Sequence, residues 1–141
     1  MATVELRFSA LPEHVRTARL VAAAVARRAG VDEAVLDEVR LAVGEACSRA
    51  VGLHVSNGIV APVRVVLVED EKKFSIEVGD EVPGGAGERA DGAVESGDAE
   101  GDDEMGLAVI SGLVDDVEVT SGEHGGVIRM SWPTTPAPAL P

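Results

Sequence analysis

Charged side chains are the main candidates for chemistry in this chain, and three places along the sequence combine them with a suggestive spacing. Glu45 and Arg49 are four residues apart in an apolar periodic run, so a helix would bring a carboxylate and a guanidinium onto one face. Asp80 follows a strand-like run, where an Asp commonly forms a turn. Acidic residues at 102–104 precede another apolar run and would favour a helix N-terminus there. At each place the charged side chains could take part in chemistry, or they could only stabilise the local structure.

Two arginines are candidates for a protein interface. Arg16 and Arg19 are three residues apart in an earlier apolar periodic run, so a helix would make them neighbours. The guanidinium fork pairs bidentately with carboxylates and is common in interfaces. Because Arg27 and Arg28 continue the basic pattern, an ordinary exposed basic face is the alternative.

Neither the cysteine nor the histidines predict a redox or metal site. Cys47 is the single cysteine, so it cannot form an internal disulfide, and its place on the apolar side of its run predicts buried packing. The three histidines, at positions 14, 54 and 124, are scattered and have no paired cysteine. We therefore expect no metal site.

Hydrophobic periodicity predicts the elements that position these residues. Alternation of apolar and polar residues predicts strands over 3–9, 63–69, 73–78, 117–121 and 127–132. Helical spacing predicts helices between Pro12 and Gly30, from Asp32 to about His54, and over 105–114. The order is β-α-α-β-β-loop-α-β-β. It predicts an α+β fold: a two-layer sandwich of a mixed, mostly antiparallel sheet with three helices on one face.

Composition narrows the classes of partner. The 141 residues include 12 basic and 25 acidic ones, a formal net charge of -13, which disfavours binding to nucleic acid phosphates or anionic membranes. Aromatic residues make up only 2% of the chain, so a base-stacking surface is not expected. Met1–Ser9 does not resemble a targeting signal, and no apolar run approaches membrane-spanning length. We expect a cytoplasmic protein.

Most of the negative charge falls in one segment. Residues 80–104 hold ten acidic residues, one basic residue and six glycines, with no large aliphatic residue other than valine. Such a segment cannot bury enough apolar area to offset the entropy of ordering, so it predicts a long flexible loop. We expect a single domain over 1–132 that contains this loop, followed by a disordered Pro-rich tail over 133–141.

Three segments, in this order, resemble the anti-sigma factor serine kinases of bacteria, which have the Bergerat-type (GHKL), histidine kinase-like ATPase fold. They are residues 6–11, residues 41–46, and residues 105–117 with the later pair Arg129-Met130. The resemblance covers the chain to about Trp132. It implies a partner-switching regulator of transcription that holds a sigma factor inactive and uses ATP to phosphorylate a serine of an anti-anti-sigma protein.

The family's first ATP-binding motif is changed in this sequence. By resemblance, Glu45 stands where a Glu prepares the attacking hydroxyl, and the family has a Mg²⁺-ligating Asn four residues later. Arg49 occupies that second position here, and a guanidinium cannot ligate a cation.

The second and third motifs are changed as well. In the Asp-x-Gly-x-Gly motif, whose Asp binds the adenine amino group, Asp80 and Gly84 are kept but Val82 replaces the first Gly. In the phosphate-binding Gly-x-Gly at the third helix, Gly106 is kept but Glu104 replaces the first Gly. The neighbouring carboxylates would repel ATP phosphates, at about 1 kcal/mol for each contact even in water.

The resemblance and these changes together predict a pseudokinase: an anti-sigma factor that binds a sigma factor, an anti-anti-sigma protein, or both, without ATP-dependent kinase activity. Arg19 matches a partner-binding arginine of the family, Arg16 is its neighbour, and Glu45 would be vestigial. No metal or cofactor is expected, although Arg49 could replace the metal's charge and allow ATP to bind without Mg²⁺. The alternatives are an active serine-protein kinase and a scaffold unrelated to sigma factors. The family also leaves a homodimer open.

Overall fold

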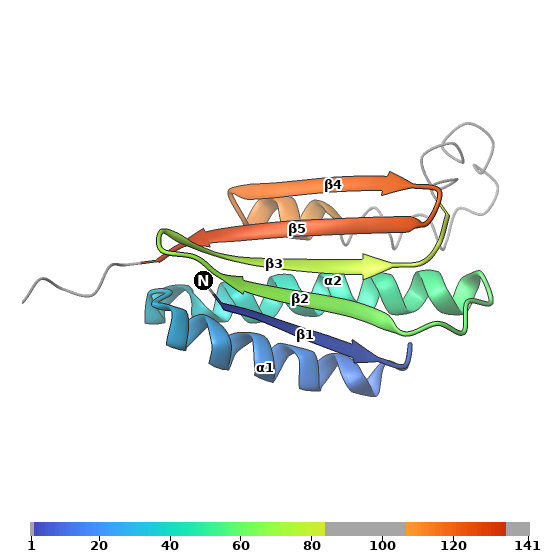
Figure 1. Cartoon of the computed structure of the whole chain (residues 1–141), viewed down its shortest axis with the longest axis horizontal. Coiled ribbons are helices and arrows are strands. Elements are labelled where there is room, and N and C mark those ends of the chain that lie inside the picture. The colour runs from blue at the N-terminus through green and yellow to red at the C-terminus, as the bar shows by residue number, and fades with distance from the viewer. Residues whose placement is uncertain (1, 84–106, 135–141) are drawn as a thin grey trace, which may run out of the picture.

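The computed structural model describes residues 2–83 and 107–134, and it places five strands in one sheet with the order β1-β2-β3-β5-β4 (Figure 1). The strands are β1 (Ala2–Phe8), β2 (Val63–Glu69), β3 (Lys73–Asp80), β4 (Asp116–Gly122) and β5 (Gly125–Pro133). All four described pairings are antiparallel, where a mixed sheet was expected. Hairpins impose this direction on β2–β3 and β4–β5, and the two helices between β1 and β2 return the chain to the end of the sheet that it left.

Helices cover one face of this sheet, as the sequence predicts (Figure 1). They are α1 (Glu13–Ala29), the short 3₁₀ helix η1 (Glu33–Val35), α2 (Leu36–Ser56) and a helical segment over 107–113. Gly30 ends α1 in the left-handed conformation at φ 103°, and Asp32 accepts a hydrogen bond from the Ala34 N–H at 2.9 Å. Both residues therefore act as the stop and start signals that their types predict.

The core lies between the sheet and the helices. The predicted stripe of α2 is buried at Val39, Ala42, Val43, Ala46 and Ala50, while Val35 before it is partly exposed. On α1 the buried positions are Val15, Ala18, Ala22, Ala23 and Ala26. Small residues along both faces let the two helices pack closely, while larger side chains from alternate strand positions, such as Leu67, Phe74 and Ile76, fill the space above them.

Several element ends differ from the prediction. β3 continues to Asp80, because Gly79 and Asp80 still pair with Val127 and Gly126 of β5. The β4–β5 turn is shorter than the five-residue loop expected, since Gly122 pairs directly with Gly125.

The domain also extends beyond residue 132. β5 includes Pro133, and the Thr134 N–H donates to the Lys72 carbonyl at 3.1 Å, so the first two residues of the predicted tail are part of the domain. Of the predicted acidic loop, residues 80–83 are described, and Val82 is buried. The rest of that loop and the tail beyond 134 lie outside the described residues.

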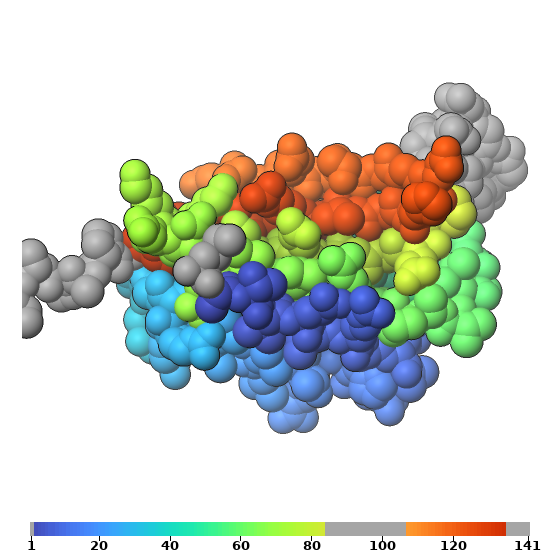
Figure 2. All heavy atoms as spheres, viewed as in Figure 1, coloured from blue at the N-terminus to red at the C-terminus, as the bar shows by residue number. Residues whose placement is uncertain are grey.

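The opposite face of the sheet lies toward the viewer in Figure 2 and carries several charged side chains, so we call it the polar face. Glu5 contacts Arg7 at 2.7 Å and Arg64 at 3.3 Å, while Arg129 lies between Glu77 at 3.9 Å and Glu118 at 4.0 Å. The hydrogen bond from Arg7 holds the pKa of Glu5 below its usual value. Exposed pairs of this kind contribute little to stability, typically about 0–1 kcal/mol each.

Candidate functional site

Asp80 ends β3 with its carboxylate turned into the protein. Its Oδ1 accepts hydrogen bonds from the Val82 N–H at 2.9 Å and from the Gly126 N–H at 3.3 Å. The first bond forms the turn that an Asp at this position predicts. The second fixes the β4–β5 hairpin to the end of β3. A Cβ at Gly126 would lie 3.0 Å from Oδ2, and one at Gly125 would lie 2.0 Å from the Asp80 carbonyl oxygen, so glycines allow this close approach.

Arg49 reaches the same carboxylate from α2. Its NH1 lies 4.0 Å from Asp80 Oδ2, and the two side chains are only 12% and 6% exposed. The pair joins the second helix to the third strand across residues that are far apart in sequence. Removing one partner of a buried ion pair typically costs about 3–5 kcal/mol.

His54 holds the adjacent backbone and is fully buried on α2. Its Nδ1 lies 2.9 Å from the Ala61 carbonyl oxygen, and its Nε2 lies 2.9 Å from the Glu81 N–H. Since a carbonyl only accepts and an amide N–H only donates, Nδ1 donates to the Ala61 carbonyl and Nε2 accepts from the Glu81 N–H. His54 therefore ties α2 to the segments before β2 and after β3.

The structure brings together only some of the predicted ATP-site residues. Arg49, Asp80 and Val82 form one cluster through the contacts above. Glu45 lies on α2 one turn before Arg49 and is partly exposed. The predicted positions Gly84, Glu104 and Gly106 lie outside the described residues.

The described part of this site differs in two respects from the Mg²⁺-dependent nucleotide site that the resemblance implies. A carboxylate that binds an adenine amino group must have a free acceptor position directed at the base. Here Oδ1 of Asp80 already accepts two backbone N–H groups and Oδ2 faces Arg49. At the position that the family gives to the Mg²⁺ ligand stands a cation, which would repel the metal rather than coordinate it.

Arg16 and Arg19 lie elsewhere, along a groove between α1 and α2. The groove has a volume of about 430 Å³ and is lined by Arg16, Arg19 and Leu20 of α1 and by Asp37, Arg40 and Leu41 of α2. Leu20 is 58% exposed and Leu41 is 54% exposed, which is high for large apolar side chains. Arg40 forms an ion pair with Asp37.

Gly44 of α2 contacts one of these arginines. A Cβ at Gly44 would lie 2.8 Å from Cδ of Arg19 and 3.5 Å from its Cγ. The aliphatic part of Arg19 therefore lies directly on the α2 backbone. A glycine inside a helix costs about 1 kcal/mol relative to alanine, and this contact is a physical reason for its presence. The sequence analysis did not identify Gly44, Leu20 or Leu41 as site residues.

Cys47 is fully buried in the core, and burial raises the pKa of its thiol to about 12. It is therefore a packed thiol rather than a reactive thiolate. Within residues 2–83 and 107–134, no group of three or more His, Cys, Asp or Glu side chains could hold a metal ion. The helices of these same ranges include none with the length and apolarity that crossing a bilayer requires.

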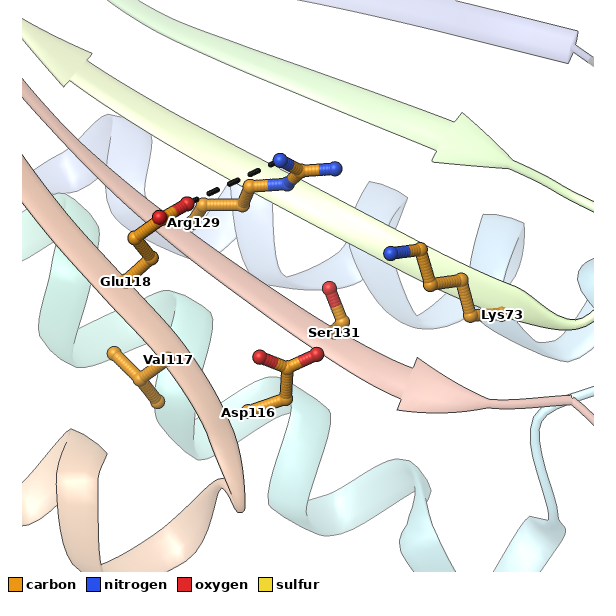
Figure 3. A pocket seen from close by; sticks show the side chains of 6 residues that line it. All are labelled: Lys73, Asp116, Val117, Glu118, Arg129 and Ser131. Carbon is orange, nitrogen blue, oxygen red and sulfur yellow. Dashed lines mark ion pairs between the residues drawn. The ribbon is translucent and has the colours of Figure 1, made fainter.

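A further cavity lies on the polar face of the sheet (Figure 3). It has a volume of about 220 Å³ and is lined by Lys73, Asp116, Val117, Glu118, Arg129 and Ser131. Figure 3 shows Arg129 directed toward Glu118, so part of its charge is already paired. None of the predicted site residues lines this cavity.

The two-layer fold, with a five-stranded antiparallel sheet covered on one face by helices, is that of the histidine kinase-like ATPase class. The family model described as "Histidine kinase-like ATPase domain" matches residues 8–132, and the chain belongs to this family. No curated protein matches the chain significantly.

The fold also matches a solved structure, the crystal structure of the RsbU and RsbW domains of Rv1364c from Mycobacterium tuberculosis. The TM-score is 0.69 and the sequence identity is 16%, over 97% of this chain and 33% of that one. The chain thus spans about a third of the length of the protein it resembles, and at this identity the match establishes the fold alone.

Proposed function

We propose that this chain is an anti-sigma regulator that works by stoichiometric binding to a sigma factor, an anti-anti-sigma protein, or both, without transferring phosphate from ATP. The observation that carries the proposal is the buried Arg49–Asp80 pair. It turns Oδ2 of the carboxylate that the resemblance assigns to adenine toward a positive charge, and it puts that charge where the family has a metal ligand.

Electrostatics supports the loss of Mg²⁺-dependent chemistry. Two like unit charges 4 Å apart repel by about 4 kcal/mol at the effective dielectric constant near a protein surface, and the metal carries two charges. A Mg²⁺ ion near α2 would therefore have to displace the arginine from Asp80.

The binding role is supported by the fold and by the exposed arginines. The solved chain that this fold matches is described as containing an RsbW domain, and the sequence resembles anti-sigma factor serine kinases. Arg16 and Arg19 line a surface groove, separate from the Arg49–Asp80 cluster. A regulator of this kind would act in the cytoplasm, where sigma factors bind RNA polymerase.

A thermal-shift titration with ATP, with and without Mg²⁺, tests the proposal. A ligand at 100 times its Kd adds about 2.7 kcal/mol to the free energy of unfolding, which would raise the melting temperature of a domain this size by several degrees. We expect no shift in either condition. A shift that needs Mg²⁺, together with phosphate transfer to an anti-anti-sigma protein, would refute the proposal.

An active serine kinase is the second candidate, and the retention of Glu45 on a partly exposed face of α2 favours it. The third possibility, that Arg49 replaces the metal's charge, requires a shift with ATP alone. The Arg49→Asn variant separates the two: it would abolish metal-independent binding, whereas it would strengthen a Mg²⁺-dependent site.

A further inference from the structure

We propose that the outer edge of β4 binds an extended segment of a partner protein in which basic and apolar residues alternate. The segment would add one strand to the sheet, which ends at β4 in the part of the chain that the structure describes. The proposal rests on the proposed function in one respect, namely that the partner is a protein. It goes further by assigning a second binding surface, at the edge of the sheet opposite β1.

The backbone of β4 is suited to further pairing. Every second residue of an edge strand directs its N–H and C=O groups away from the sheet, where another strand can pair with them. All seven residues of β4 pair with β5 in one continuous register, so the strand is regular along its length. It contains neither proline nor lysine, two residues that commonly prevent pairing at an edge.

The two faces of β4 determine which side chains suit the added strand. Asp116 and Glu118 lie on the polar face of the sheet, where both line the cavity of Figure 3. Val117 and Val119 lie on the face toward the helices, because their partners on β5 are buried in the core. Residues opposite each other in neighbouring strands share a face. An added strand therefore meets carboxylates and valines in alternation.

The carboxylates of β4 favour basic side chains opposite them. Arg129 of β5 lies 4.0 Å from Glu118 but also 3.9 Å from Glu77, so one guanidinium serves two carboxylates. Asp116 forms no ion pair within residues 2–83 and 107–134. Neighbouring strands are about 4.8 Å apart, so an added strand lies next to β4, two spacings from Arg129 and three from Lys73 of β3. Its side chains meet the carboxylates before they meet these cations.

The other face of β4 favours apolar side chains. Val119 is 48% exposed, although it lies on the side of the sheet that the helices cover. Val109, in the helical segment over 107–113, is 40% exposed. Apolar β-branched residues pair well across antiparallel strands, and covering Val119 removes apolar surface from water. We therefore expect valine or isoleucine opposite this position.

The edge at β1 is a poorer match for a basic segment. On the polar face of that strand, Glu5 contacts Arg7 at 2.7 Å and Arg64 at 3.3 Å, so its single carboxylate is already paired with two guanidinium groups. The charges near β1 thus sum to a positive value on this face, whereas those of β4 itself are negative. A basic strand is repelled at the first edge and attracted at the second.

A second copy of this chain is a poorer occupant of the β4 edge than a basic segment. Pairing of two β4 strands would bring the carboxylates of both copies, Asp116 and Glu118 of each, onto one face of the joined sheet. Like charges on neighbouring strands destabilise the pairing. The edge therefore selects a partner of opposite charge rather than itself.

The first experiment measures binding of a synthetic peptide to the full chain by fluorescence anisotropy. The peptide alternates lysine and valine over about seven residues, the length of β4. One control has glutamate in place of lysine, and another has the same composition with the lysines and valines in separate blocks. We expect the alternating peptide to bind and both controls to bind at least about tenfold more weakly. No binding at millimolar concentration, or equal binding of the block peptide, would overturn the proposal.

Methylation of the peptide backbone tests whether the contact is a strand pairing. An added strand uses the N–H groups of one edge only, which belong to alternate residues. N-methylation of one alternate set should abolish binding, whereas methylation of the other set should leave it unchanged. Equal effects of the two sets would show that side-chain charge alone attracts the peptide, and would overturn the proposal.

Hydrogen exchange followed by NMR locates the peptide on the chain. We expect amides of alternate residues over 116–122 to exchange more slowly when the peptide is bound, and amides over 2–8 in β1 to be unaffected. Protection in β1 or in α1 instead of β4 would overturn the assignment.

Two double variants, matched in charge, separate local contacts from general attraction to an acidic chain. Asp116→Asn/Glu118→Gln removes the carboxylates of β4, and we expect it to weaken binding of the alternating peptide about tenfold. Asp70→Asn/Glu71→Gln removes the same two charges from the exposed turn between β2 and β3, and should leave the affinity nearly unchanged. Equal losses in the two variants would overturn the proposal.

Sedimentation of the parent chain without peptide tests the other occupant. We expect no dimer that depends on β4. A dimer that is lost in Val119→Lys, which places a lysine in the middle of the edge strand, would show that β4 pairs with a second copy and would overturn the proposal. None of these measurements involves ATP or Arg19. The nucleotide test can therefore fail while the β4 edge stands, and the β4 edge can fail while the nucleotide result stands.

Discussion

Two clusters of arginine and carboxylate in this chain differ in where their charges are directed. At the junction of α2 and β3, Arg49 and Asp80 are buried, and the carboxylate also accepts two backbone N–H groups. In the α1–α2 groove, Arg16 and Arg19 are exposed and form no ion pair with any acidic residue in the described ranges. Charges compensated inside the fold serve stability, whereas charges directed outward are available for recognition. The comparison predicts opposite consequences of substitution in the two regions.

The largest effect on stability is expected at the junction of α2 and β3, where Arg49 faces Asp80. Asp80→Ala should lower the free energy of unfolding by about 3–5 kcal/mol, because it removes the buried carboxylate that faces Arg49 and the acceptor of the Val82 and Gly126 N–H groups. Urea denaturation followed by circular dichroism measures the change.

A double-mutant cycle sharpens this result. Arg49→Met in the Asp80→Ala background should lower the free energy of unfolding much less than Arg49→Met alone, since the Asp80 charge is already gone. Additive losses would mean that the two side chains do not interact, and the proposal that this pair disfavours a metal ion would lose its support.

A smaller effect is expected at His54. His54→Leu should lower the free energy of unfolding by roughly 2–4 kcal/mol, because the Ala61 carbonyl and the Glu81 N–H each lose a part-buried hydrogen bond, at about 1–2 kcal/mol apiece, in the lower part of the range for an unsatisfied group. His124→Leu, in the exposed β4–β5 turn, is the matched control and should change stability little. Equal losses in the two variants would show that the buried ring does not hold the segments together.

Local patterns in the sequence predict the elements of this fold well. Alternation in 63–69 gives β2 with the bounds that the structure has, and the glycine at position 30 marks the end of α1. Both signals act within a few residues, where side-chain type decides backbone geometry. The relative direction of β1 and β2 is harder to predict, because local patterns mark each strand but do not show that the two helices between them return the chain to the end of the sheet that it left.

The candidate site was harder to predict because its contacts are long-range. The spacing places Arg49 and Glu45 on one helix face, but in the structure Arg49 contacts Asp80, which is thirty-one positions later in the sequence. His54 had an available signal, since it lies four residues after Ala50 on the buried face of α2, yet its two partners are on other segments. A signal in the sequence also marks Leu20 and Leu41, because both are large apolar residues outside the predicted buried faces.

The smallest effect on stability, with the largest effect on binding, is expected in the groove. Arg19→Glu should change the free energy of unfolding by no more than about 0.5 kcal/mol, because the side chain is exposed and holds no ion pair in the described ranges. The same substitution reverses the charge of the side chain that the resemblance assigns to partner binding. Pull-down of candidate sigma factors and anti-anti-sigma proteins should therefore fail with Arg19→Glu and succeed with Arg27→Glu, whose charge lies outside the groove. A scaffold unrelated to sigma factors would capture none of these candidates even as the parent chain. If instead Arg19→Glu unfolds the protein while Asp80→Ala does not, the assignment of the two clusters to recognition and stability is reversed.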